Sequence, residues 1–193
     1  KWKPGSVPSA GSDVPIEARA TVPNGYTANA GEITMGSGGS ITLEDGGQLV
    51  SATSVPVAVK KTINKAVMDG SNVKNCYTLS TPTHDNGSNQ QLIEHITNLT
   101  SYEYDMFKYD EPTNIWLNQK TSQAAAGFSS IDISTGYIYR NGLDGKIDAM
   151  DISFNGYTNV GTINRYTVTN TAEEGNGFNL IGNPYPHRIY KAV

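Results

Sequence analysis

The chain has 193 residues, of which 37% are apolar and 17% charged, and its formal net charge at pH 7 is −4. That length is enough to bury a core without disulfides or metal, and a single cysteine excludes an internal disulfide. The basic residues form no cluster larger than Lys60, Lys61 and Lys65, so we do not expect a nucleic-acid partner.

The composition favours a protein built from strands. Gly, Ser, Thr and Asn are abundant, and these residues suit short strands joined by tight turns. No apolar run reaches the roughly 18 residues of a membrane span, so the sequence predicts none. The sequence opens on Lys1 rather than methionine, which fits a chain whose secretion leader has been removed and leaves export open.

Two consecutive octets, Glu32–Gly39 and Ser40–Gly47, share the phrase x-Ile-Thr-apolar-x-x-Gly-Gly. Apolar residues alternate with threonine, so each octet predicts a short strand with one buried face, ended by a glycine turn. The same alternation occurs upstream in Ser12–Val22. Two arrangements fit, a meander of hairpins or octets stacked as coils of a β-solenoid. We therefore expect residues 1–59 to be a Gly-rich, solenoid-like scaffold.

Residues 60–193 predict a larger antiparallel unit. Stretches such as Tyr102–Asp110 alternate as strands do, and turn signals separate them at the spacing typical of a β-sandwich or jelly roll. One helix is expected over Ser88–Leu99, where apolar residues recur at helical spacing. The fold class is therefore all-β, with a solenoid-like or hairpin section followed by a sandwich, the two packed as one unit.

One aromatic-x-Leu motif that leads into a proline occurs twice, in Tyr77–Pro82 and in Phe178–Pro184. Each copy reads as a core strand that ends where proline cannot donate to the ladder. The two segments are expected to be neighbours in one sheet. Cys76, directly before the first copy, is expected to be a buried and inert thiol.

Four motifs occur along the chain in a fixed order. They are W-x-P-G-S-V-P-S-A-G-S-D-V from Trp2, Y-D-M-F-K-Y-D-E over Tyr104–Glu111, G-Y-I-Y-R-N from Gly136 and G-F-N-L-I-G-N-P-Y-P from Gly177. Their order resembles a β-rich module of secreted and cell-surface proteins of Bacteroidetes. The resemblance implies export, a secreted or surface setting, no cofactor and no assigned reaction. Cys76 and Phe178 depart from it, because such modules have other aromatics there.

Aromatic residues supply the best functional signal. The candidate ligand-binding residues are Tyr102, Tyr104, Tyr109 and Trp116, which lie within fifteen positions of one another. Tyrosine and tryptophan suit both stacking on sugars and contacts with proteins. The competing interpretation is that these rings fill the core of the sandwich, with their hydroxyls reaching the surface.

Metal and catalytic signals are weaker. Asp144, Asp148 and Asp151 are candidate ligands of a structural Ca²⁺, although the spacing of an EF-hand is missing. His84, His95 and His187 stand apart and predict no zinc site. A carboxylate pair for glycoside hydrolysis would come from Asp105, Asp110, Glu111, Glu173 and Glu174.

These observations favour a non-enzymatic module of a secreted or surface-exposed bacterial protein that serves adhesion, ligand binding or surface architecture. The first alternative is a carbohydrate-binding module with an aromatic platform, and the second is a polysaccharide-active enzyme. The expected partners are a host or microbial glycan or a surface protein. No cofactor is expected, and the sequence does not indicate an oligomeric state.

Overall fold

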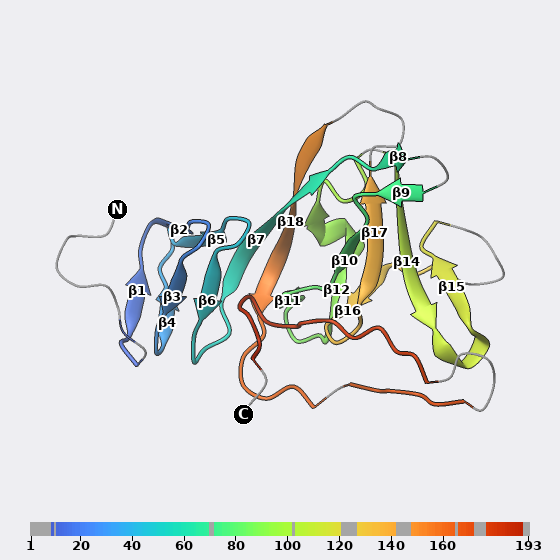
Figure 1. Ribbon diagram of the computed structural model, residues 1–193. Helices are drawn as coiled ribbons and strands as arrows, with labels where there is room; N and C mark the ends of the chain where they lie inside the picture. The colour runs from blue at the N-terminus through green and yellow to red at the C-terminus, as the bar shows by residue number, and fades with distance from the viewer. Residues whose placement is uncertain are drawn as a thin grey trace.

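The computed structural model describes residues 9, 11–69, 72–101, 103–120, 127–141, 148–164, 166–171 and 177–190. Within these residues the fold is all-β, as the composition predicted (Figure 1). The helical segments are two single turns of 3₁₀ helix, η1 (Ile93–His95) and η2 (Glu111–Thr113). No helix in the described part of the chain has the length and apolar character needed to cross a bilayer.

The N-terminal section is a parallel β-solenoid with three strands to each coil, on the left of Figure 1. Its strands are β1 (Val14–Ile16), β2 (Arg19–Val22), β3 (Thr27–Asn29), β4 (Ile33–Met35), β5 (Ser40–Leu43) and β6 (Gln48–Val50). Strand β1 pairs in parallel with β4, β2 with β5, and β3 with β6. Parallel pairing decides for the solenoid and against the meander of hairpins.

The two octets occupy successive sides of one coil and do not stack on each other. The first octet carries β4 and the second carries β5. Each strand stacks on the preceding coil instead, so that Val14 faces Ile33 and Ala20 faces Ile41. The expected stacking of octet on octet is therefore wrong, although the expected strands and turns are present.

The last glycine of each octet is required by close backbone approach. A Cβ atom on Gly39 would lie 2.1 Å from the carbonyl oxygen of Ile16, and one on Gly47 would lie 2.4 Å from that of Val22. No side chain fits at such distances, so the corner can press against the preceding coil only because glycine is there. The glycine pairs shape the scaffold, as the sequence indicated.

The solenoid encloses a core of its own. Leu43 is completely buried, and the alternating apolar positions of the octets point inward as predicted. The buried members of this cluster are Val14, Ile16, Ile33, Ile41, Leu43, Leu49, Val55 and Val57.

Strand β7 (Pro56–Asn64) joins the two sections of the fold. It extends the solenoid in parallel with β5 and runs antiparallel to the long strand β18 (Ala149–Thr158). Val59 packs against the solenoid core and also against the second core. The division into residues 1–59 and 60–193 stays a prediction, and β7 crosses that boundary.

The second section consists of two sheets that face each other across one core. One sheet has the order β10 (Tyr77–Leu79), β17 (Tyr137–Asn141), β14 (Tyr104–Asp110) and β15 (Ile115–Asn118), with antiparallel pairing throughout. The facing layer is β7 and β18, which β11 (Thr83–His84) and β13 (Ile96–Thr97) extend. Two-stranded pairs complete the section: β8 (Val67–Asp69) with β9 (Asn72–Lys74), and β12 (Gln90–Leu92) with β16 (Ser130–Asp132).

The core between these sheets is rich in tyrosine. Its buried members come from both layers and from the β12–β13 region; they are Ile63, Leu79, Ile93, Ile96, Leu99, Tyr104, Met106, Ile131, Tyr137, Tyr139, Ile152 and Phe154. This packing of sheet on sheet is the sandwich that the strand spacing predicted.

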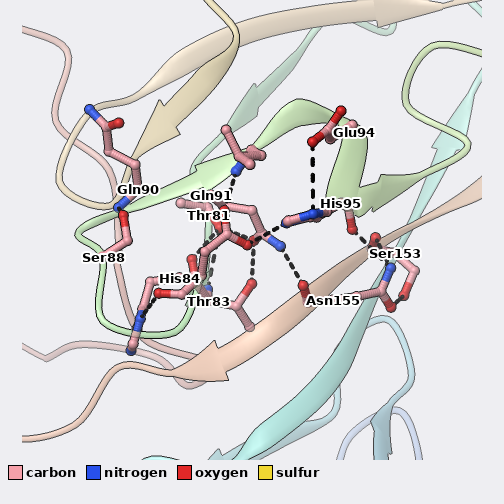
Figure 2. A network of polar contacts seen from close by, with 12 residues as sticks. Thr81, Thr83, His84, Ser88, Gln90, Gln91, Glu94, His95, Ser153 and Asn155 are labelled. Atoms are coloured by element: carbon pink, nitrogen blue, oxygen red, sulfur yellow. Dashed lines mark hydrogen bonds and ion pairs between the residues drawn. The ribbon is translucent and has the colours of Figure 1, made fainter.

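The helix predicted over Ser88–Leu99 is wrong: this segment forms β12, η1 and β13. A buried polar network explains the difference (Figure 2). The Gln91 side chain is fully buried; its Oε1 accepts hydrogen bonds from the hydroxyls of Thr81 and Thr83, and its Nε2 donates to the carbonyl oxygen of Asn155, 2.8 Å away. A helix would carry Gln91 away from these three partners.

The C-terminal segment runs along one side of both sections and returns toward the solenoid (Figure 1). It is fixed to the solenoid by a hydrogen bond from the Leu49 N–H to the Pro186 carbonyl at 3.0 Å. The Ser80 hydroxyl donates to the Asn183 carbonyl at 2.9 Å, so the two aromatic-x-Leu motifs do meet. They are not sheet neighbours, however, because Ile181 makes an isolated bridge to Thr135 instead.

Candidate functional site

Three aromatic side chains gather at the surface where β14 ends and β15 begins. Tyr109 and Trp116 face each other across the two strands, with ring centroids 5.1 Å apart. The ring of Phe178, from the C-terminal segment, lies nearly perpendicular to that of Tyr109, with ring centroids 5.7 Å apart. Trp116 remains 40% exposed and Phe178 59% exposed. We call these three residues the aromatic cluster.

The turn between β14 and β15 sets the geometry of this cluster. Strand β14 ends in η2, and Asn114 then takes a left-handed conformation with φ of 52°, which asparagine tolerates. The chain reverses there into β15. The Asn114 side chain also accepts a hydrogen bond from the Tyr109 hydroxyl at 2.8 Å, which fixes the ring of Tyr109 beside Trp116.

Glu111 connects this turn to the C-terminal segment. Its carboxylate is buried, and Oε1 accepts hydrogen bonds from the Thr171 N–H and hydroxyl, both at 2.9 Å, and from the Gly177 N–H at 3.1 Å. The nearby hydroxyl of Thr169, followed by the Thr171 N–H, lowers the pKa of Glu111 from 4.5 to about 2. Because Gly177 directly precedes Phe178, this carboxylate positions the third ring of the aromatic cluster.

A groove of about 930 Å³ adjoins the aromatic cluster. Its walls come from the β11–β12 turn, the end of β14, the residues after β16 and the C-terminal segment. Its lining residues include the aromatic side chains Tyr109 and Tyr166, the apolar Ile181, and polar groups of Gln90, Lys108, Asp110, Glu111, Asp132, Asn164 and Asn179. We call this feature the groove.

A second, smaller cavity of about 310 Å³ lies where the C-terminal segment meets the solenoid. Two of its basic groups are already engaged: Lys60 Nζ lies 3.1 Å from Glu44 Oε1, and Lys61 Nζ lies 2.9 Å from Asp45 Oδ1. The groove is larger and adjoins the exposed rings of the aromatic cluster, so the two together form the stronger candidate site.

A family model described as "Domain of unknown function (DUF8693)" matches residues 1–192. The chain belongs to this family. No curated protein and no solved structure matches the sequence. The DUF8693 family model thus covers both the solenoid and the sandwich.

Two of the four predicted aromatic residues of the DUF8693 chain, Tyr109 and Trp116, meet in the aromatic cluster. Tyr104 does not join them: it is 9% exposed and stacks on Tyr139 in the core, with ring centroids 5.9 Å apart. Its hydroxyl donates to Gln119 Oε1 at 2.6 Å, so the competing interpretation as core filler holds for this residue. Tyr102 lies outside the described residues.

Phe178 is the residue of the aromatic cluster that the sequence did not indicate. The sequence predicts a core strand for the motif around it, yet residues 177–186 form no strand. The side chains of Phe178 and Ile181 are each 59% exposed. A sequence signal was present, because the resemblance placed an aromatic residue here. Such a residue is equally typical of a core.

Asp148 and Asp151, the two candidate calcium ligands within the described residues, each have a different polar partner. Asp148 Oδ1 lies 3.1 Å from Lys65 Nζ, and Asp151 Oδ1 accepts a hydrogen bond from the Thr62 hydroxyl at 2.8 Å. Within the described ranges there is no group of three or more His, Cys, Asp or Glu side chains that could hold a metal. Asp144 lies outside those ranges, so the calcium site stays a prediction.

The remaining candidates fall in separate places. His95 Nδ1 lies 2.6 Å from Asp85 Oδ1, and this hydrogen bond raises the pKa of His95 above its ordinary value. Asp105 forms an ion pair with Arg140, whose Nη2 lies 2.6 Å from Asp105 Oδ2. Glu173 and Glu174 lie outside the described residues. Cys76 is exposed, so the expectation of a buried thiol is wrong.

Proposed function

We propose that the protein is a non-enzymatic binding module of a secreted or surface-exposed bacterial protein, and that the aromatic cluster with the adjoining groove is its binding surface. The observation that carries this proposal is the exposure of Trp116 and Phe178 around a tethered Tyr109. Adhesion or surface architecture would follow from binding at this place.

Trp116 and Phe178 are large apolar side chains that remain 40% and 59% exposed although each lies against or beside the ring of Tyr109. Exposed apolar surface costs free energy in water and, where side chains of this size gather, is typical of interaction sites. Aromatic residues at the centre of an interface also supply much of its binding energy, because they bury a large area with few rotatable bonds.

The carbohydrate-binding alternative receives support from the groove more than from a flat platform. The ring planes of Tyr109 and Trp116 are inclined by 50°, and those of Tyr109 and Phe178 by 76°. Rings at such angles do not offer one flat surface to an extended sugar chain. The groove, however, combines the rings of Tyr109 and Tyr166 with many polar groups.

The carboxylates of the groove support a binding role over hydrolysis. A general acid must hold a proton near neutral pH, and the pKa of Glu111 is lowered to about 2. Asp132 accepts a hydrogen bond from Gln90 at 2.6 Å and lies 3.4 Å from Lys108 Nζ. These carboxylates act as acceptors that hold neighbouring segments in place.

The secreted or surface setting is proposed on the motif resemblance alone. The motifs that carry it fall in both sections of the fold, and the last of them contributes Phe178 to the aromatic cluster. A binding surface made partly from such a motif is consistent with a module whose ligand lies outside the cell.

A binding screen tests the proposed function. The purified chain is applied to arrays of glycans and of surface-protein fragments, in parallel with Trp116→Ala and with Tyr26→Ala as the matched control. Tyr26 is 68% exposed and lies in the solenoid, away from the aromatic cluster. We expect saturable binding that Trp116→Ala weakens at least about tenfold and Tyr26→Ala leaves unchanged. Absence of binding, or equal binding by both variants, would refute the proposal.

A further inference from the structure

We propose that the groove binds a neutral glycan chain; this inference rests on the proposed function and adds the chemical class of the ligand. The groove would accept uncharged sugar units with hydroxyl groups on their edges and apolar C–H faces. Four properties of the groove carry the inference: its size, its charge, its fixed tyrosine rings and its occupied backbone groups.

The size of the groove favours an extended ligand. Its volume of about 930 Å³ lies near the top of the roughly 300–1,000 Å³ that small-molecule sites span. Five separate stretches of the chain line it, so an extended ligand can contact several of them along its length. An oligomer suits such a groove better than a single compact molecule does.

The charge of the groove disfavours polyanions. Among the described residues, its lining includes three carboxylates, Asp110, Glu111 and Asp132, and one cationic side chain, Lys108. Lys108 Nζ already lies 3.4 Å from Asp132 Oδ2. A uronate, a sulfated glycan or a nucleic acid would meet net negative charge from these described residues, whereas the hydroxyls of a neutral sugar can donate hydrogen bonds to the oxygens of Asp110 and Asp132.

The two tyrosine rings of the groove are held in place before any ligand arrives. The Tyr166 hydroxyl donates to the Gly182 carbonyl at 3.2 Å, and the Tyr109 hydroxyl is held by Asn114 at 2.8 Å. Tyr166 is 39% exposed, so part of its surface is open. Fixed rings lose little conformational entropy on binding, and their apolar faces can pack against the C–H faces of a sugar.

The backbone of the groove disfavours an extended peptide. A peptide that adds a strand needs free N–H and C=O groups along an edge. Here the two backbone stretches along the wall bond to each other, from Gly136 N–H to Leu180 O and from Gly182 N–H to Ser134 O, each at 2.9 Å. The groove therefore offers mainly side-chain oxygens and amides, which suit hydroxyl groups.

Calorimetric titration of the whole chain tests the inference with three probe sets. These are neutral hexasaccharides (cello-, xylo- and manno-oligosaccharides), oligogalacturonate of the same length, and a set of lysine-rich hexapeptides. Tyr166→Ala removes a ring from the groove and Tyr166→Phe keeps it. Asn164→Trp fills the groove from an exposed position and so guards against a folding defect in Tyr166→Ala. Tyr26→Ala is again the control.

We expect a neutral hexasaccharide to bind, with an affinity that Tyr166→Ala and Asn164→Trp each reduce at least about tenfold and Tyr166→Phe reduces less than about threefold. The affinity should stay constant between about 0.05 and 0.5 M NaCl, because no ion pair forms. Groove-dependent binding of oligogalacturonate or peptide would overturn the inference and leave the proposed function standing. Neutral-sugar binding that both groove variants retain would also overturn it. Absence of binding in all three sets and in the array screen would overturn both proposals.

Discussion

Gln91→Leu is expected to destabilise the protein. From the sequence alone this change looks favourable, because leucine is similar in size to glutamine, is apolar, and adds to the apolar residues that recur at helical spacing in this segment. The Gln91 side chain is fully buried, and its amide has three partners. After the change the Thr81 hydroxyl can still donate to the Thr83 carbonyl at 2.6 Å. The Thr83 hydroxyl loses its hydrogen bond to the Gln91 Oε1, and the Asn155 carbonyl loses its hydrogen bond from the Gln91 Nε2.

The size of the effect follows from the burial of these two groups. The Thr83 hydroxyl is fully buried, and a buried polar group without a partner costs about 1–3 kcal/mol; Asn155 is an exposed residue, so its carbonyl is not counted, and the free energy of unfolding should fall by roughly 1–3 kcal/mol. That is a large share of the roughly 5–15 kcal/mol that stabilises an ordinary domain. Adding Thr83→Val to Gln91→Leu removes the unpartnered buried hydroxyl and should recover most of this loss.

Urea unfolding followed by circular dichroism measures both variants. The matched control is Gln90→Leu, because Gln90 is the adjacent residue, has the same side chain and is exposed. Its loss should stay below about 1 kcal/mol. A loss under about 0.5 kcal/mol for Gln91→Leu, or equal losses for the two glutamines, would refute the assignment of Gln91 as the residue that fixes this segment.

Three further predictions concern the scaffold and its pH dependence. Gly39→Ala should lower the free energy of unfolding, measured in urea, by about 1–3 kcal/mol, because its Cβ would lie 2.1 Å from the Ile16 carbonyl oxygen. Glu111→Gln should flatten the acid side of the stability curve: the wild-type carboxylate, with its pKa lowered to about 2, stabilises the fold above pH 4.5 and loses this effect as the pH falls toward 2. His95→Ala should lower stability more at about pH 5.5 than at about pH 9. The bond to Asp85 raises the pKa of His95, so its stabilisation is complete below 6.5 and is lost as the pH rises through the raised value.

Each of these predictions has a control and a contrary outcome. Ser37→Ala, at an exposed position of the same corner, should be neutral, and an equal loss there would contradict the close-approach argument. An unchanged acid limb in Glu111→Gln would contradict the role of this carboxylate as a clamp. Parallel stability curves for the wild type and His95→Ala across that range would contradict the coupling to Asp85.

The sequence alone determined the local structure of the solenoid. Alternation of Ile, Thr and Leu in the octets requires extended segments with one buried side, and the glycine pairs require turns. What it left open was the partner of each strand. Parallel stacking joins Val14 to Ile33 and Ala20 to Ile41, and an alternating pattern is equally compatible with a hairpin. Only the closing of the chain into coils, with Gly39 pressed against Ile16, decides between them.

For the aromatic residues, too, the sequence determined one part of the arrangement and the tertiary structure decided the other. Tyr104 and Tyr109 are five positions apart on one strand, so alternation already places them on opposite faces, one in the core and one outside. Which face is buried depends on the sheet that packs against it. Phe178 reaches Tyr109 only because Glu111 bonds Thr171 and Gly177 across some sixty residues of sequence. A local pattern fixes the direction of each side chain, whereas a contact between distant segments exists only once the layers have packed.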